Sequence, residues 1–99
     1  MSKYKGEGYS TTFNLGIQKV LCRKQMKDGR LLQLVSLGPT LKAILYVKDD
    51  LLICAKTWSI PHNLSARKEQ NTMILHEYNF YKMLLMSGKL VSFDGVDLT

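Results

Sequence analysis

The sequence predicts an α+β fold, in which an antiparallel β-meander of four to five strands is followed by one amphipathic helix. The first observation is a series of apolar, alternating segments joined by very short turns. Turns this short connect antiparallel neighbours, and consecutive strands then pair in order. The second observation is a later segment that places Phe80, Met83 and Leu84 on one face at helical spacing and stops at Gly88.

The strands are expected at residues 12–22, 31–37, 41–47 and 51–58. Asp28-Gly29 predicts the first turn, since both residues tolerate the backbone angles of a tight hairpin. Pro39 ends the second strand because proline cannot donate a ladder hydrogen bond. Lys48-Asp49-Asp50 predicts the turn between the last two strands.

The polar, basic stretch 59–71 is expected to be irregular, because Pro61 and Asn63 oppose regular structure at its start. Residues 72–75 are expected to form a short strand, and the helix to begin near His76. Gly88 is a natural helix stop. Residues 90–93 are apolar enough for either an extra strand or a docking tail.

Length and composition indicate one folded domain of 99 residues, 45% hydrophobic and 22% charged. Residues 1–10 are expected to be a flexible basic arm and residues 11–99 the domain. No apolar run reaches the roughly 20 residues that cross a bilayer, so no membrane partner is expected. The first six residues are polar and lack the apolar stretch of a signal peptide. An intracellular location is therefore expected: the nucleus in a eukaryotic or nuclear viral setting, otherwise the cytoplasm. Cys22 and Cys54 are expected to be buried thiols.

The positive charge is uneven, because residues 1–68 hold twelve of the fourteen Lys and Arg but four of the eight acids. A cationic body attracts polyphosphate backbones at long range. The alternative is a solvated basic surface without a partner.

No enzymatic activity, metal or cofactor is expected. His62 and His76 have no third ligand type nearby in the sequence, so a zinc site is not predicted. Asp49-Asp50 fits a hairpin turn better than a metal-binding pair. No Gly-rich phosphate loop occurs.

Trp58 is the most informative residue, because it closes an apolar strand just before the basic stretch. Strand alternation puts Lys56 and Trp58 on one face, which offers a cation beside a ring that can stack on an unpaired base. Tyr46, across the hairpin, is a second possible stacking ring. The alternative for both aromatics is a role in the core or in a dimer interface.

Residues 41–58 and 73–80 resemble the positive cofactor four family of transcriptional coactivators. The resemblance lies in the strand Leu41–Val47, the turn, the strand Leu51–Trp58 with its aromatic end, and the helix entry Met73–Phe80. It implies a curved antiparallel sheet, one helix, dimerisation through the helices and single-stranded DNA held against the sheets. It also implies base contacts at Tyr46 and Trp58.

This sequence departs from the family pattern in three places. The hairpin turn is Lys48-Asp49-Asp50 rather than lysine and glycine, His76-Glu77 replaces Asn-Pro, and the first forty residues match poorly. The extra hairpin of that first part keeps the related Whirly-type fold as a second resemblance.

Single-stranded nucleic acid, with DNA favoured, is thus the predicted partner of a homodimer that serves transcription or replication. The alternative is a small protein-interaction or virion-associated structural module that uses its aromatic strand face as an interface. The predicted nucleic-acid contacts are Lys42, Tyr46, Lys48, Lys56, Trp58, Arg67 and Lys68. The predicted helix-packing and dimer residues are Phe80, Met83 and Leu84.

Overall fold

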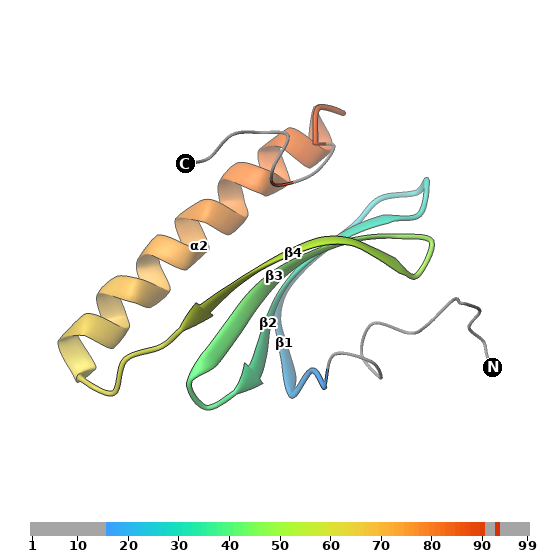
Figure 1. Cartoon of the computed structure of the whole chain (residues 1–99). Coiled ribbons are helices and arrows are strands. Elements are labelled where there is room, and N and C mark those ends of the chain that lie inside the picture. The colour runs from blue at the N-terminus through green and yellow to red at the C-terminus, as the bar shows by residue number, and fades with distance from the viewer. Residues whose placement is uncertain (1–15, 91–92, 94–99) are drawn as a thin grey trace.

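A four-stranded antiparallel meander and one helix make up the computed structural model, which describes residues 16–90 and Phe93. The elements are β1 (Lys19–Gln25), β2 (Arg30–Gly38), β3 (Leu41–Lys48), β4 (Leu51–Ser59) and α2 (Leu64–Met86) (Figure 1). The predicted α+β class is confirmed. The arm expected over residues 1–10 and the strand start expected at residues 12–15 lie outside the described residues. Among the described residues, the first strand begins at Lys19.

Both predicted hairpin turns are present, and their tips are joined. Asp49 and Asp50 have φ of 52° and 67°. Both therefore occupy the left-handed region that the two central residues of a type I′ hairpin turn need. Gly29, in the first turn, has φ of 94°. The Asp49 backbone N–H donates to the Gly29 carbonyl at 3.0 Å, which ties the β3–β4 tip to the β1–β2 tip.

The sheet separates two apolar clusters, because alternate residues point to opposite faces. On one face, sheet residues pack against the buried residues of α2, Ile74, Tyr78, Tyr81 and Leu85. That sheet face contributes Leu32, Leu34, Ile44 and Tyr46. The opposite face buries Val35, Ala43, Leu45 and Val47, with Ile17, Leu31 and Leu37 packed against them.

Helix α2 begins at Leu64, twelve positions before the predicted start at His76. Asn63 is the N-cap, and its Oδ1 accepts a hydrogen bond from the Ala66 N–H at 3.0 Å. The predicted irregular stretch 59–71 is therefore confirmed only for residues 60–63, and the strand predicted over 72–75 is wrong. The reason is that residues 66–70 (Ala-Arg-Lys-Glu-Gln) are all strong helix formers, while Pro61 lies before the cap and does not interrupt them.

The predicted end of the helix is confirmed. Gly88 has φ of 75°, and the N–H groups of Gly88 and Lys89 donate to the carbonyls of Leu85 and Leu84. Beyond this cap, Leu90 and Phe93 are buried. The ring centroids of Phe93 and Tyr81 are 4.4 Å apart and the rings stack, so Leu90 and Phe93 dock on the core. Residues 91–92 lie outside the described part. In the described part of the chain, no helix has the length and apolar character needed to span a membrane.

Candidate nucleic-acid interface

Trp58 and Lys42 lie directly opposite each other in the ladder between β4 and β3. Both side chains are partly buried, and Trp58 packs against the core cluster that α2 covers. Lys56 precedes Trp58 on the same strand face, and its Nζ is 5.4 Å from the centre of the indole ring. That distance is within the range of a cation–π contact. The indole therefore has the Lys56 ammonium within cation–π range and Lys42 as its cross-strand neighbour.

Lys56 is also held by an acid on α2. Its Nζ donates to Glu77 Oε2 at 3.0 Å, and the same oxygen accepts from the Tyr81 hydroxyl at 3.4 Å. The Lys56 and Glu77 side chains are 35% and 26% exposed, so solvent screens the pair. Burial, followed by the Glu77 charge, raises the pKa of Tyr81. The network joins β4 to α2, and the Glu77 carboxylate offsets the charge of Lys56.

Lys42 and Arg67 form a second group of cations. Lys42 Nζ donates to Asn71 Oδ1 at 2.7 Å, and Arg67 Nη2 donates to the Pro39 carbonyl at 2.8 Å. Burial lowers the pKa of Lys42, and the nearby charge of Arg67 lowers it further. Among the described residues, the ion pairs are Arg30–Asp28 and Lys56–Glu77, so neither Lys42 nor Arg67 has a carboxylate partner there. We call Lys42, Lys56, Trp58 and Arg67 the Trp58 strip.

Three predicted contacts lie elsewhere. Tyr46 is 4% exposed, and its hydroxyl donates to the Leu90 carbonyl, so its predicted role in stacking on bases is wrong. Its ring points to the same sheet face as Ile44, under the helix. Lys48 is exposed at the β3–β4 tip. Lys68 is exposed on α2, and both Arg67 and Lys68 belong to a regular helix rather than to the flexible loop that was expected.

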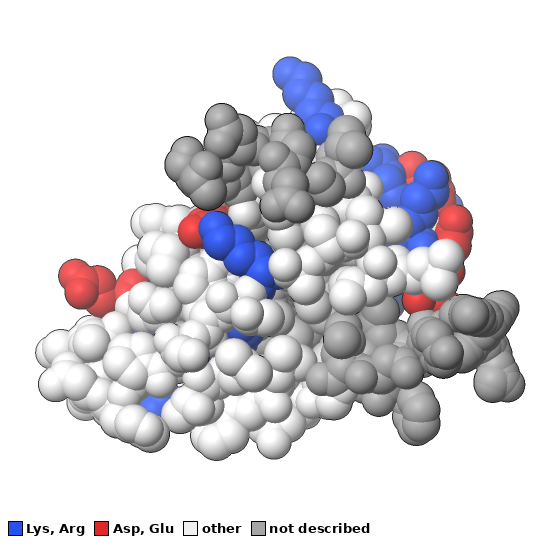
Figure 2. Space-filling view, in the orientation of Figure 1, with Lys and Arg blue, Asp and Glu red and all other residues white. Residues whose placement is uncertain are grey.

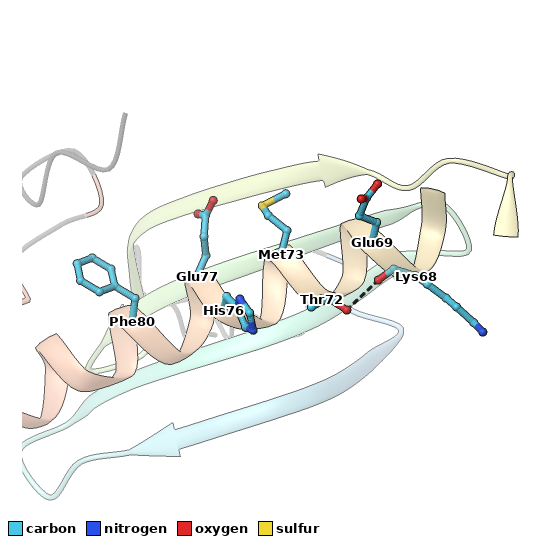
Figure 3. A pocket seen from close by; sticks show the side chains of 7 residues that line it. All are labelled: Lys68, Glu69, Thr72, Met73, His76, Glu77 and Phe80. Atoms are coloured by element: carbon cyan, nitrogen blue, oxygen red, sulfur yellow. Dashed lines mark hydrogen bonds between the residues drawn. The ribbon is translucent and has the colours of Figure 1, made fainter. Parts of the chain in front are cut away.

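An open groove of about 690 Å³ runs along one flank of α2. Figure 3 shows Glu69, Met73 and Glu77 projecting together from the helix, with Phe80 further along. Lys68, Thr72 and His76 complete the lining, and the Thr72 hydroxyl donates to the Lys68 carbonyl. Of the predicted nucleic-acid contacts, this groove contains Lys68 alone. Its apolar and mixed-charge lining suits a protein surface better than a phosphate backbone.

The three predicted helix-packing residues divide between core and surface. Leu84 packs against the core cluster, whereas Phe80 and Met83 are 38% and 59% exposed. Figure 2 shows few charged side chains over β4 and the neighbouring flank of α2, and a gathering of charges at the end where the hairpin tips lie. The exposed apolar side chains of α2 therefore border a face with little charge.

Other chemistry is sparse in the described part. Across residues 16–90 and Phe93, no group of three His, Cys, Asp or Glu is arranged to hold a metal ion. Cys22 and Cys54 are thiols and are partly buried rather than fully buried as expected. A second groove, of about 410 Å³, lies at the first hairpin and is lined by Lys24, Lys27 and Arg30 together with Asp28.

Sequence reasoning missed two partners of the Trp58 strip. Asn71 lies four positions after Arg67, so recognising the helix from residue 64 would have placed both on one helical face. Glu77 carries no comparable sequence signal, because its pairing with Lys56 depends on how α2 packs across the sheet.

Comparison of the chain with protein families, with curated proteins and with solved structures found no match. The resemblance to the positive cofactor four family thus rests on residues 41–58 and 73–80. In the structure, the segment that resembled a helix entry, Met73–Phe80, lies inside α2.

Proposed function

We propose that this protein binds single-stranded nucleic acid, with DNA favoured, through the Trp58 strip and that it acts as a homodimer in transcription or replication. Trp58 stacks on a base, and Lys42 and Arg67 bind neighbouring phosphates. Lys56 contributes less because Glu77 shares its charge. The resemblance of the last two strands to the coactivator family supports the same function.

One observation carries the proposal: a partly exposed indole lies opposite Lys42 and 5.4 Å from the Lys56 ammonium. Base–aromatic stacking contributes about 1–3 kcal/mol per base and tolerates any sequence. Lys42 and Arg67 add two charges without a carboxylate partner among the described residues. A phosphate between them would offset their mutual repulsion.

A titration with labelled oligonucleotides tests the proposal. We expect a single-stranded oligonucleotide to bind more tightly than its duplex, with an affinity that falls steeply as salt is added. Equal affinity for the duplex, or binding that does not respond to salt, would exclude this mode of recognition.

A second candidate function is a protein-interaction or virion-associated structural module. The observation in its favour is the groove on α2, where Met73 and Phe80 are 37% and 38% exposed beside a face with few charges. A contact of this kind is mainly apolar and loses little strength when salt is added. The same salt series therefore distinguishes the two candidates.

A further inference from the structure

The two edges of the described sheet differ in charge. β1 carries Lys19, Arg23 and Lys24, and charged side chains on an edge strand, lysine above all, oppose pairing with another chain. β4 contains one charged residue, Lys56, whose ammonium is held by Glu77. The β4 edge of the described sheet therefore lacks the free cationic side chains that oppose pairing with another chain at the β1 edge.

The register shows which backbone groups of β4 point outward. Hydrogen-bonded and non-hydrogen-bonded pairs alternate along an antiparallel ladder. The Ile60 N–H donates to the Thr40 carbonyl at 2.7 Å, so Thr40 and Ile60 form a hydrogen-bonded pair. The N–H and C=O groups of Ala55, Thr57 and Ser59 then face away from β3. These three side chains are exposed, small and uncharged.

We propose that the β4 strands of two copies of this chain pair antiparallel about a two-fold axis at Thr57, which joins the two sheets into one. In this register Thr57 faces Thr57 of the second copy, and Ala55 faces Ser59. Lys56 lies opposite Trp58 of the second copy, on the faces that the helices cover. The inference specifies the interface of the proposed homodimer and does not depend on nucleic-acid binding.

A second copy is the occupant because this edge is complementary to itself. A two-fold axis at Thr57 brings together no like charges at the outward-facing positions, and opposed threonines pair favourably across strands. The basic β1 strands lie at the far edges of the joined sheet, so this arrangement keeps these two cationic strands apart. The groove residues Met73 and Phe80 flank Glu77, which reaches β4, so both helices bring apolar side chains toward the same junction.

Sedimentation of the full chain tests the pairing, with Thr57→Pro as the main variant. Proline removes an outward N–H and leaves the β3 ladder intact. Thr57→Val is the matched control, since it keeps the N–H and a β-branched side chain. We expect the wild type and Thr57→Val to be dimers, and the dissociation constant of Thr57→Pro to rise about tenfold or more. Far-ultraviolet circular dichroism shows whether the variant is folded.

A charge exchange tests the register even if Thr57→Pro fails to fold. Thr57→Lys and Thr57→Glu each place like charges face to face across the axis, so the homodimer of either variant should dissociate. An equimolar mixture of the two variants should form a heterodimer, because the facing charges are then opposite. A monomeric wild type, or a dimer unaffected by all three variants, would overturn the inference. A dimer that breaks as expected but binds no oligonucleotide would refute the proposed function alone, while an unaffected dimer that binds would refute the pairing alone.

Discussion

Lys56 Nζ lies 3.0 Å from Glu77 Oε2, and this ion pair connects the edge strand β4 to the middle of α2. The contact has two consequences. It helps to orient the helix over the sheet, and it offsets a cation that lies beside the Trp58 ring. Because both side chains are partly solvated, the pair contributes less than about 1 kcal/mol to stability. Its larger effect is therefore on the electrostatics of the Trp58 strip.

Glu77→Gln should strengthen nucleic-acid binding. Glutamine keeps an oxygen that can accept from Lys56 and from Tyr81, but it no longer offsets the Lys56 charge. We expect tighter binding and a salt dependence that is steeper by about 0.7, the value for one further phosphate contact on a single strand. Glu69→Gln is the matched control, since Glu69 is exposed on the same helix and has no ion pair among the described residues. An equal gain in both variants would mean that net charge alone, rather than Lys56, controls affinity.

Trp58→Ala should weaken single-strand affinity by about 1–3 kcal/mol, through the loss of one stacking ring. Trp58→Phe should lose less, because a smaller ring remains. Trp58 is the single tryptophan of the chain, so quenching of its fluorescence on binding is directly assignable. Trp58 also packs against the core, so circular dichroism of each variant is the control for folding. An unchanged fluorescence signal at saturating oligonucleotide would rule out contact between a base and this ring.

The sequence predicted the strands of the meander and both hairpin turns, because alternation and turn-forming residues are local signals. The start of the helix was predicted too late, also for a local reason. The prediction relied on Pro61 and the polar character of the stretch and gave too little weight to the helix propensity of residues 66–70. Tyr46 was misjudged for a different reason. Alternation places Tyr46 and Trp58 on one sheet face, but only the path of α2 decides which of them is covered. The ion pair of Lys56 with Glu77 depends on the same packing.

Phe80→Glu should weaken the dimer. Phe80 is 38% exposed in the groove on the flank of α2, where Met73 and Glu77 also project. A buried, unpaired carboxylate at an interface is costly, so we expect the dimer to dissociate at micromolar concentration. Leu75→Glu is the control, because Leu75 is 41% exposed on the same helix and does not line the groove. Light scattering checks both variants against the monomer mass of 11.3 kDa. Equal dissociation of both variants would show that the effect is not specific to the groove, and a dimer unaffected by Phe80→Glu would place the interface away from it.

Asp50→Gly should stabilise the protein. Asp50 has φ of 67°, a backbone conformation that an L-residue adopts at a cost and that glycine adopts freely. The second position of this two-residue turn favours glycine, so we expect a gain of about 0.5–1 kcal/mol in the free energy of unfolding. Chemical denaturation of both proteins measures this difference in the free energy of unfolding. Asp50→Ala is the control, since it removes the same charge but keeps the strain. A gain of equal size in the alanine variant would assign the effect to charge.

Tyr78 should make the protein sensitive to alkali. Burial raises the pKa of Tyr78 from 10.0 to about 12, and the hydroxyl donates to the Leu32 carbonyl on β2 at 3.3 Å. As pH rises above about 10, the unfolded chain loses this proton before the folded chain does. The stability that is fully present below pH 10 is therefore lost between about pH 10 and 12, by an amount on the order of 3 kcal/mol.

Tyr78→Phe isolates this effect from the other groups that titrate at high pH. At neutral pH the variant should be less stable than the wild type by about 1 kcal/mol, because it lacks the hydrogen bond to Leu32. Between pH 10 and 12 the difference should shrink and then reverse, since phenylalanine has no proton to lose. Urea denaturation at a series of pH values gives both free energies of unfolding. A difference that stays constant up to pH 12 would show that the Tyr78 hydroxyl titrates alike in the folded and unfolded chains.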